Sequence, residues 1–141
     1  MSRPQEFVLD GSVTMSWYFQ DEANEYADSV RDSLGPWQAV VPTLWPLEVA
    51  NTLVVGERRK RSTPAQAATW LGLLEAFPIT VDNETTAQAW VETLALARAR
   101  NLSAYDAAYL ELAMRRGVPL ATLDDKLRAA AAAVGVALYT A

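Results

Sequence analysis

The chain has 141 residues, 51% of them apolar, which suits one compact domain with a single core. It contains no cysteine and no histidine, which excludes disulfides, thiolate nucleophiles, Ser-His-Asp catalysis and every thiolate or imidazole metal ligand. The net charge of −5 argues against sequence-independent coating of nucleic acid, because summed positive charge supplies that affinity. Because cysteine and histidine are absent, side-chain ligands of any metal ion must be oxygens, which favours Mg²⁺ or Mn²⁺.

Five short apolar runs have the composition of β-strands and alternate with longer segments of helical periodicity. The runs are residues 6–9, 39–41, 78–81, 119–122 and 136–139. This alternation predicts an α/β fold of three layers, in which helices cover both faces of a mainly parallel sheet. We expect one domain over residues 1–141, with no signal peptide and no membrane span, in the cytoplasm.

Helices are expected between these strands, at residues 21–34, 44–55, 64–75, 84–100, 104–116 and 124–134. Gly35-Pro36 stops the first, and Thr63 followed by Pro64 is a typical helix start. In the segment 84–100 one face is apolar and consists of Ala87, Trp90, Val91, Leu94 and Ala97.

Three aspartates follow predicted strands, where ligands bind in open parallel sheets. Asp10 follows the first strand, and Asp124 and Asp125 follow the fourth. If these strands are neighbours, Asp10 and Asp124 flank one crevice. Local alternatives exist, because Asp10 can cap a helix that starts near Ser12, and the other two can complement a helix dipole behind a Thr122 cap.

Glu48 lies in the most apolar helical stretch of the chain. Its spacing predicts a stripe shared with core residues, namely Leu44, Leu47, Asn51 and Val55. An unpaired carboxylate there would cost several kcal/mol, so Glu48 must be protonated, paired or open to a solvated cleft. The structural alternative is a buried Glu48 satisfied by Asn51 or Arg58.

Asp106 also has two interpretations. Its distance from Ser103 is that of an N-cap with an acid at the third helical position, and its spacing with Tyr109, Leu110 and Ala113 points it inward. Capping explains several of these acids one at a time, but not all four together. Carboxylates packed together raise each other's pKa unless a cation neutralises them, so the set predicts a divalent metal site.

These segments together resemble the PIN-domain family, and in particular the VapC-type toxins of bacterial toxin–antitoxin pairs. The resemblance rests on four blocks in order, which are Asp10-Gly11-Ser12, Glu48 with Asn51, residues 102–110 around Asp106, and Thr122-Leu123-Asp124. It covers nearly the whole chain. No single block is specific, but their order and separations are.

The resemblance implies a Rossmann-like sheet of strand order 3-2-1-4-5 and endonucleolytic RNA cleavage with Mg²⁺ or Mn²⁺. Asp10, Glu48, Asp106 and Asp124 are the implied acidic positions, with Asp10 and Asp106 as direct ligands. Supporting positions are Asn51, Thr122, Ser12 and, as an extra acid, Asp125. A homodimer and a cognate antitoxin, which sends a basic side chain toward the acids, are the implied partners.

The only concentrated positive charge is the run Arg58, Arg59, Lys60 and Arg61, at the expected end of the helix that carries Glu48. It could contact RNA phosphates, or it could face water and complement the helix C-terminus. Two other functions stay open. A phosphoacceptor or phosphatase domain is disfavoured by the single aspartate after the first strand, and a PIN domain that only binds is disfavoured by the complete acids.

Overall fold

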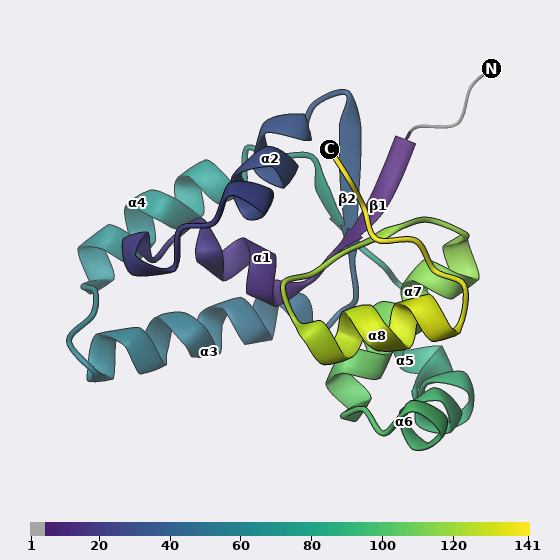
Figure 1. Cartoon of the computed structure of the whole chain (residues 1–141). Helices are drawn as coiled ribbons and strands as arrows, with labels where there is room; N and C mark the ends of the chain where they lie inside the picture. Colours follow the sequence, from purple (N-terminus) through teal and green to yellow (C-terminus); the bar gives the residue numbers. More distant parts are fainter. Residues whose placement is uncertain (1–4) are drawn as a thin grey trace.

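The computed structural model describes residues 5–141, so the first four residues of the predicted domain lie outside the description. Its sheet has four parallel strands in the order β3-β2-β1-β4. The strands are β1 (Gln5–Leu9), β2 (Trp37–Val41), β3 (Ile79–Val81) and β4 (Leu120–Ala121). Helices lie on both sides of the sheet, which confirms the predicted α/β class (Figure 1).

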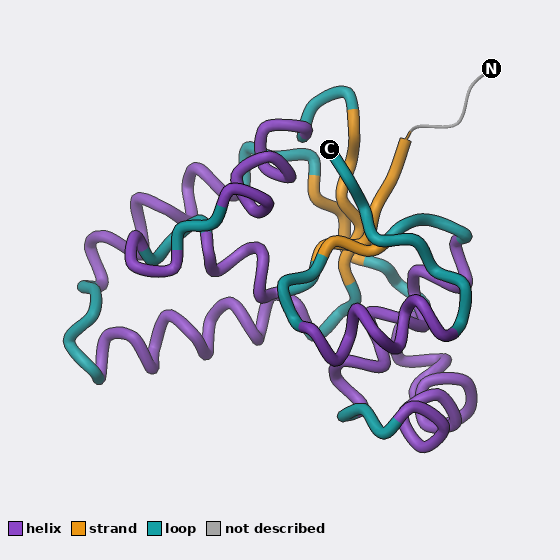
Figure 2. Tube along the Cα trace, in the orientation of Figure 1, coloured by secondary structure: helices purple, strands orange, loops and turns teal. Residues whose placement is uncertain are grey.

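The helices of the first half are α1 (Gly11–Ser16), η1 (Gln20–Glu22, 3₁₀), α2 (Glu25–Ser33), α3 (Trp45–Arg58) and α4 (Pro64–Leu74). Those of the second half are α5 (Thr85–Gln88), η2 (Ala89–Thr93, a π-helical turn), α6 (Leu94–Arg100), α7 (Ala104–Arg116) and α8 (Asp125–Ala133). In Figure 2, α3 and α4 extend from the sheet as an arm, while α5 to α8 lie together on the other side. Among the described helices none is long and apolar enough to cross a membrane.

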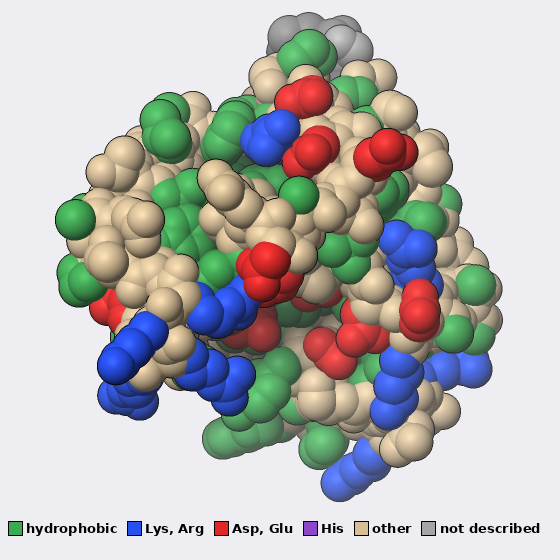
Figure 3. Space-filling view, turned by 60° about the vertical axis from the view of Figure 1, so that its left-hand side comes forward, with side chains coloured by type: hydrophobic (Ala, Val, Ile, Leu, Met, Phe, Trp, Pro, Cys, Tyr) green, Lys and Arg blue, Asp and Glu red, His purple; other side chains and the backbone are tan. Residues whose placement is uncertain are grey.

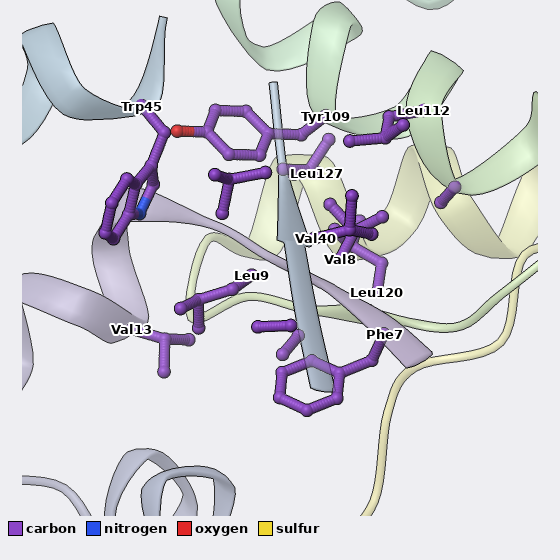
Figure 4. Close-up of a cluster of buried hydrophobic side chains, with 14 of the residues drawn as sticks. Phe7, Val8, Leu9, Val13, Val40, Trp45, Tyr109, Leu112, Leu120 and Leu127 are labelled. Atoms are coloured by element: carbon purple, nitrogen blue, oxygen red, sulfur yellow. The ribbon is translucent and has the colours of Figure 1, made fainter. Parts of the chain in front are cut away.

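The core is centred on β1, where Phe7, Val8 and Leu9 are all fully buried (Figure 4). Residues that alternate sides of a strand are buried together only when both faces of the sheet are covered. Val8 is paired with Val40 of β2 and Leu120 of β4, which fixes the register at the centre of the sheet. The carboxyl ends of the four strands therefore open onto one edge.

The predicted fifth strand is reduced to a single bridge between Leu138 and Leu120. Its position beyond β4 is the one expected for order 3-2-1-4-5, but β4 has only two residues and offers no ladder to extend. Side-chain packing holds this segment instead. The ring of Tyr139 is 2% exposed and stacks on Phe7 at a centroid distance of 4.0 Å.

Two predicted helices are divided. Residues 21–34 form η1 and α2, because Asn24 caps α2 by accepting a hydrogen bond from the Ala27 amide. Residues 84–100 form α5, η2 and α6, and the predicted apolar face is wrong, since Trp90 is 89% exposed and Val91 is 63% exposed. The π-helical turn holds more residues than an α-turn, so it rotates the face on which the preceding residues lie.

Candidate active site

The four predicted acids line one cleft of about 430 Å³ at the carboxyl edge of the sheet. It lies beside β1, because β4 pairs with β1 as the predicted crevice required. Figure 3 shows acidic side chains around a hollow in the surface, with Lys and Arg side chains on both sides. The lining residues include Asp10, Glu48, Asp106, Asp124, Ser12, Thr52 and a fifth acid, Glu22, that the sequence analysis did not select.

Asp10 is 6% exposed and occupies the N-cap position of α1, but its side chain makes no capping hydrogen bond. Instead, its Oδ2 accepts hydrogen bonds from the hydroxyls of Ser12 and Thr122, each at 2.7 Å. The predicted N-cap position of Asp10 is therefore confirmed, but its side chain bonds these hydroxyls instead of capping the helix. Both side-chain donors meet the same oxygen, which fixes the plane of the carboxylate at the floor of the cleft.

The two hydroxyls are themselves fixed by the loop after β4. The Leu123 amide donates to Ser12 Oγ at 3.0 Å, and the Asp124 amide donates to Thr122 Oγ1 at 3.0 Å. Each hydroxyl accepts a hydrogen bond from an amide of this loop and donates its own proton to Asp10, so the donor and the acceptor of every bond in this network are determined. The predicted Thr122 cap of α8 does not form. That role belongs to Asp124, whose Oδ1 accepts from the Leu127 amide at 2.8 Å.

Glu48 is half-buried, and its Oε1 accepts a hydrogen bond from the hydroxyl of Tyr109. The predicted stripe of core residues is wrong, because Leu47 is 74% exposed and Asn51 is also exposed. The buried side of α3 is formed by Trp45, Val49, Leu53 and Gly56, so Glu48 lies at the edge of that side and faces the cleft. Its partner is neither Asn51 nor Arg58.

Asp106 lies at the third position of α7, where its amide donates to the capping Ser103 Oγ at 3.0 Å. The cap predicted from this spacing therefore forms, and the carboxylate still reaches the cleft. Thr122 is fully buried and reaches the site through its hydrogen bond to Asp10, and two further predicted supporting positions are exposed and do not line the cleft. Asn51 is exposed on α3, where Thr52 lines the cleft instead, and Asp125 is exposed in the first turn of α8.

Three acids of the cleft have raised pKa values. Burial raises the pKa of Asp10 most, the Asp124 charge adds to it, and the bonds from Thr122 and Ser12 partly offset both. The pKa of Glu48 is raised by burial and by the charges of Asp10 and Asp106, although the Tyr109 hydrogen bond lowers it. For Asp106 burial and the charges of Asp10 and Asp124 raise the pKa. The acids therefore lie within one another's electric field and favour a bound cation.

An acid after a strand is not sufficient to make a site. Asp82 follows β3 and is 2% exposed, but it bonds Arg115 Nη2 at 2.8 Å and Thr85 Oγ1 at 2.9 Å. Burial raises the pKa of Asp82, yet the Arg115 and Thr85 bonds outweigh it and leave the pKa lowered. Arg115 also bonds Glu111 at 2.8 Å. This charge cluster is satisfied internally, whereas the cleft is not.

The basic run is divided by its contacts. Arg61 bonds Asp21 at 2.9 Å and Glu22 at 2.8 Å, and its guanidinium lies 3.9 Å from the centre of the Phe19 ring. It therefore ties the end of α3 to the cleft rim. Arg58, Arg59 and Lys60 are exposed, and no ion pair joins them to an acid among residues 5–141.

The fold and the cleft define an α/β domain whose site consists of carboxylates and hydroxyls at the carboxyl edge of a parallel sheet. The PIN domain family model matches residues 7–133, and the chain belongs to the PIN-domain family. It is 30% identical over 122 residues to Ribonuclease VapC3 of Pyrobaculum aerophilum, a match that covers 86% of this chain and 92% of that protein.

Solved structures share the fold at low sequence identity. Mycobacterium tuberculosis VapC20, described as a sarcin-ricin loop cleaving toxin, has a TM-score of 0.66 and 17% identity, over 96% of this chain and 99% of that one. A chain of a toxin-antitoxin complex from Klebsiella pneumoniae has a TM-score of 0.59 and 18% identity, over 87% and 90%. The sheet and its flanking helices are therefore those of PIN domains.

Tyr109 was not assigned a role from sequence, since no local pattern links it to a glutamate 61 residues away. We expect Tyr109→Phe to raise the pKa of Glu48 further, because the lost hydrogen bond favours the charged carboxylate. If RNA cleavage needs Glu48 ionised, the acid limb of the pH profile of kcat/KM moves to higher pH. A hydrogen bond worth about 1.4 kcal/mol shifts the pKa by about one unit. At pH values on the acid limb kcat/KM should therefore fall about tenfold, and at alkaline pH it should fall less.

Tyr105→Phe is the matched control, because Tyr105 lies on the same helix and is 66% exposed. Its pH profile should match that of the wild-type protein. An unmoved acid limb in Tyr109→Phe would show that the hydroxyl does not tune Glu48.

Proposed function

We propose that this protein is a divalent-metal-dependent endoribonuclease, and the toxin of a VapBC-type toxin–antitoxin pair. The observation that carries the proposal is the convergence of Asp10, Glu48, Asp106 and Asp124 on one cleft. The ribonuclease and toxin names of the relatives support this activity. In a chain without histidine, an acidic cleft that acts on phosphodiesters requires a cation to offset its own charge.

The donor set suits Mg²⁺ or Mn²⁺, since these ions prefer carboxylate oxygens. Among residues 5–141 no group of three or more acidic side chains is arranged to hold an ion, so the proposed site uses two carboxylates and leaves the other ligand positions to water and the phosphodiester. Asp10 and Asp106 are the proposed ligands, with Glu48 and Asp124 beside them. The ion would supply Lewis-acid stabilisation of charge on the phosphodiester.

The residues of the chain then have separate tasks. Ser12 and Thr122 orient the Asp10 carboxylate and favour its charged form, because both donate to it. Glu48 is the proposed group that exchanges a proton with the reacting water, since burial and the neighbouring acids raise its pKa and the Tyr109 hydroxyl holds its carboxylate in the cleft. Asn51 and Asp125, exposed outside the cleft lining, have no part in this arrangement.

Metal-dependent cleavage of RNA tests the proposal directly. Purified protein incubated with structured RNA should cut it internally with Mg²⁺ or Mn²⁺ and stop when EDTA is added. Mn²⁺ alone should also raise the thermal midpoint, because a ligand at about 100 times its Kd stabilises the folded state by about 2.7 kcal/mol. Cleavage that persists in EDTA would contradict the proposed metal dependence, and metal binding without cleavage would favour a PIN domain that only binds RNA.

We propose that the exposed Arg58, Arg59 and Lys60 contact RNA phosphates beside the cleft. Arg59→Glu combined with Lys60→Glu should weaken RNA binding and reduce the salt dependence of log K by about one unit per lost phosphate contact. Filter binding over a series of salt concentrations measures both. Arg98→Glu combined with Arg100→Glu, on α6, makes the same charge change. If the two double mutants weaken RNA binding equally, the cause is a general charge effect rather than a contact of Arg59 and Lys60 with phosphate.

The proposed partners are a cognate antitoxin and a second copy of this chain, in the cytoplasm. The toxin-antitoxin complex among the structural neighbours supports the first. The adjacent Trp90 and Val91, which are 89% and 63% exposed, support the second, since exposed large apolar side chains favour association. Light scattering after size exclusion should give the mass of a dimer, and a monomer mass would contradict the proposed self-association.

A further inference from the structure

Arg128 on α8 donates a hydrogen bond from Nε to the backbone carbonyl of Thr122 at 2.8 Å. We infer that Arg128 is a positioning residue of the cleft, which acts through Thr122 on Asp10. The inference rests on the proposed function and adds to it a residue whose side chain has no hydrogen bond or ion pair with the four acids of the cleft among residues 5–141. Side chains that hold a metal ligand in place through hydrogen bonds set the orientation of that ligand in many sites.

The peptide unit between Thr122 and Leu123 is held at both ends. Its carbonyl accepts from Arg128, and its N–H donates to Ser12 Oγ at 3.0 Å. The side-chain hydroxyl on the same unit, that of Thr122, bonds Asp10 at 2.7 Å, and Ser12 bonds the same Asp10 oxygen. Rotation of this one peptide would therefore disturb both donors to Asp10 together.

Arg128 is itself fixed. Its guanidinium lies 5.2 Å from the centre of the Tyr26 ring, and the Tyr26 hydroxyl donates to the Tyr139 carbonyl at 2.7 Å. Helix α2 and the C-terminal segment thus both hold the arginine in place. This contact leaves Nε directed at a single acceptor.

The Arg128 side chain bonds a backbone carbonyl rather than an acid. Arg128 lies four residues after Asp124, a spacing at which ion pairs commonly form on a helix. Among residues 5–141, however, no ion pair joins Arg128 to Asp124 or to any other acid. The Asp124 carboxylate thereby remains in the cleft lining, while the arginine holds the loop.

Arg128→Gln and Arg128→Met form a matched pair. Glutamine places an N–H donor at the same number of bonds from Cα as the arginine Nε, and methionine places a methyl group there. We expect Arg128→Met to weaken Mn²⁺ binding at least about tenfold, which is the usual effect of losing a hydrogen bond that orients a metal ligand, and Arg128→Gln to stay close to wild type. Isothermal titration without RNA measures this, with circular dichroism to check folding.

Amide hydrogen exchange at Leu123 provides a readout that needs no metal. Exchange should be faster in Arg128→Met than in Arg128→Gln, because the N–H loses its fixed direction toward Ser12. If Arg128→Met does not fold, Arg128→Lys replaces it. Lysine keeps the charge but moves the donor one atom farther out, so it should bind Mn²⁺ more weakly than the glutamine variant.

Equal behaviour of the glutamine and methionine variants in both measurements would overturn the inference, whether both match wild type or both are impaired. Failure of the proposed function has a different signature. In that case the wild-type protein binds no Mn²⁺, while the exchange difference at Leu123 between the two variants persists if Arg128 holds the loop.

Discussion

Asp10→Asn is expected to reduce RNA cleavage about a thousandfold or more while the protein stays folded. Asparagine keeps an oxygen that can accept from Ser12 and Thr122, so the network around residue 10 survives and only the charge is lost. Metal-based stabilisation of transition-state charge amounts to several kcal/mol, and about 4 kcal/mol corresponds to three powers of ten in rate. Asp106→Asn should have a similar effect. Single-turnover cleavage at saturating Mn²⁺ measures both.

Asp125→Asn is the matched control for these substitutions. Asp125 is an exposed acid that follows the same loop but does not line the cleft, so its removal should leave cleavage within about twofold of wild type. Full activity in Asp10→Asn at saturating metal would rule out Asp10 as a ligand and with it the proposed site.

Without metal, Asp10→Asn should stabilise the protein at neutral pH. The pKa of Asp10 is raised, so the folded state binds its proton more tightly than the unfolded state does. The wild-type protein therefore loses stability as pH rises through the folded pKa, and Asp10→Asn does not. The difference should vanish below the unfolded pKa of about 4, where Asp10 is protonated in both states.

Arg115→Met is expected to destabilise the fold by about 3–5 kcal/mol, because it leaves the buried Glu111 without a cation and the buried Asp82 with only the longer Arg116 pair. Asp82 and Glu111 are 2% and 5% exposed and both bond Arg115, whose own side chain is 20% exposed. Urea unfolding measures the loss. Because the pKa of Asp82 is lowered, the stability that depends on this pair is present above the unfolded pKa and is lost as pH falls through the folded one.

Arg116→Met is the neighbouring control and should cost less than about 1 kcal/mol. Arg116 is 35% exposed, and its pairs with Glu6 at 3.2 Å and Asp82 at 3.6 Å are longer. Combining Arg115→Met with Asp82→Asn and Glu111→Gln should restore part of the lost stability, since no buried charge then lacks a partner. Equal losses in Arg115→Met and Arg116→Met would contradict this account of the cluster.

The sequence by itself determined the α/β class and the four acids of the cleft. Alternation of buried strands with amphipathic helices is a local pattern, and the position of Asp10 or Asp124 after a strand assigns it to one edge of a parallel sheet. The predicted caps at Ser103 and Thr63 also formed, because capping depends on residues three positions apart.

Tertiary structure decided which polar groups meet. Tyr109 bonds Glu48 across 61 residues and Thr122 bonds Asp10 across 112, and no local periodicity encodes such pairs. It also separated Asp82, an acid after a strand that Arg115 neutralises, from the acids that remain available to a cation. The π-helical turn of η2 exposed Trp90, because helical spacing predicts a face only where the helix is regular.

The four acids are therefore brought to the cleft in two different ways. Strand order and the carboxyl edge of the sheet bring Asp10 and Asp124 together, whereas Glu48 and Asp106 reach the cleft only because α3 and α7 pack beside it. Local sequence selects residue types and positions along an element. Contacts between distant segments determine which of these carboxylates are neutralised, which are oriented by hydroxyls, and which remain free to bind a metal ion.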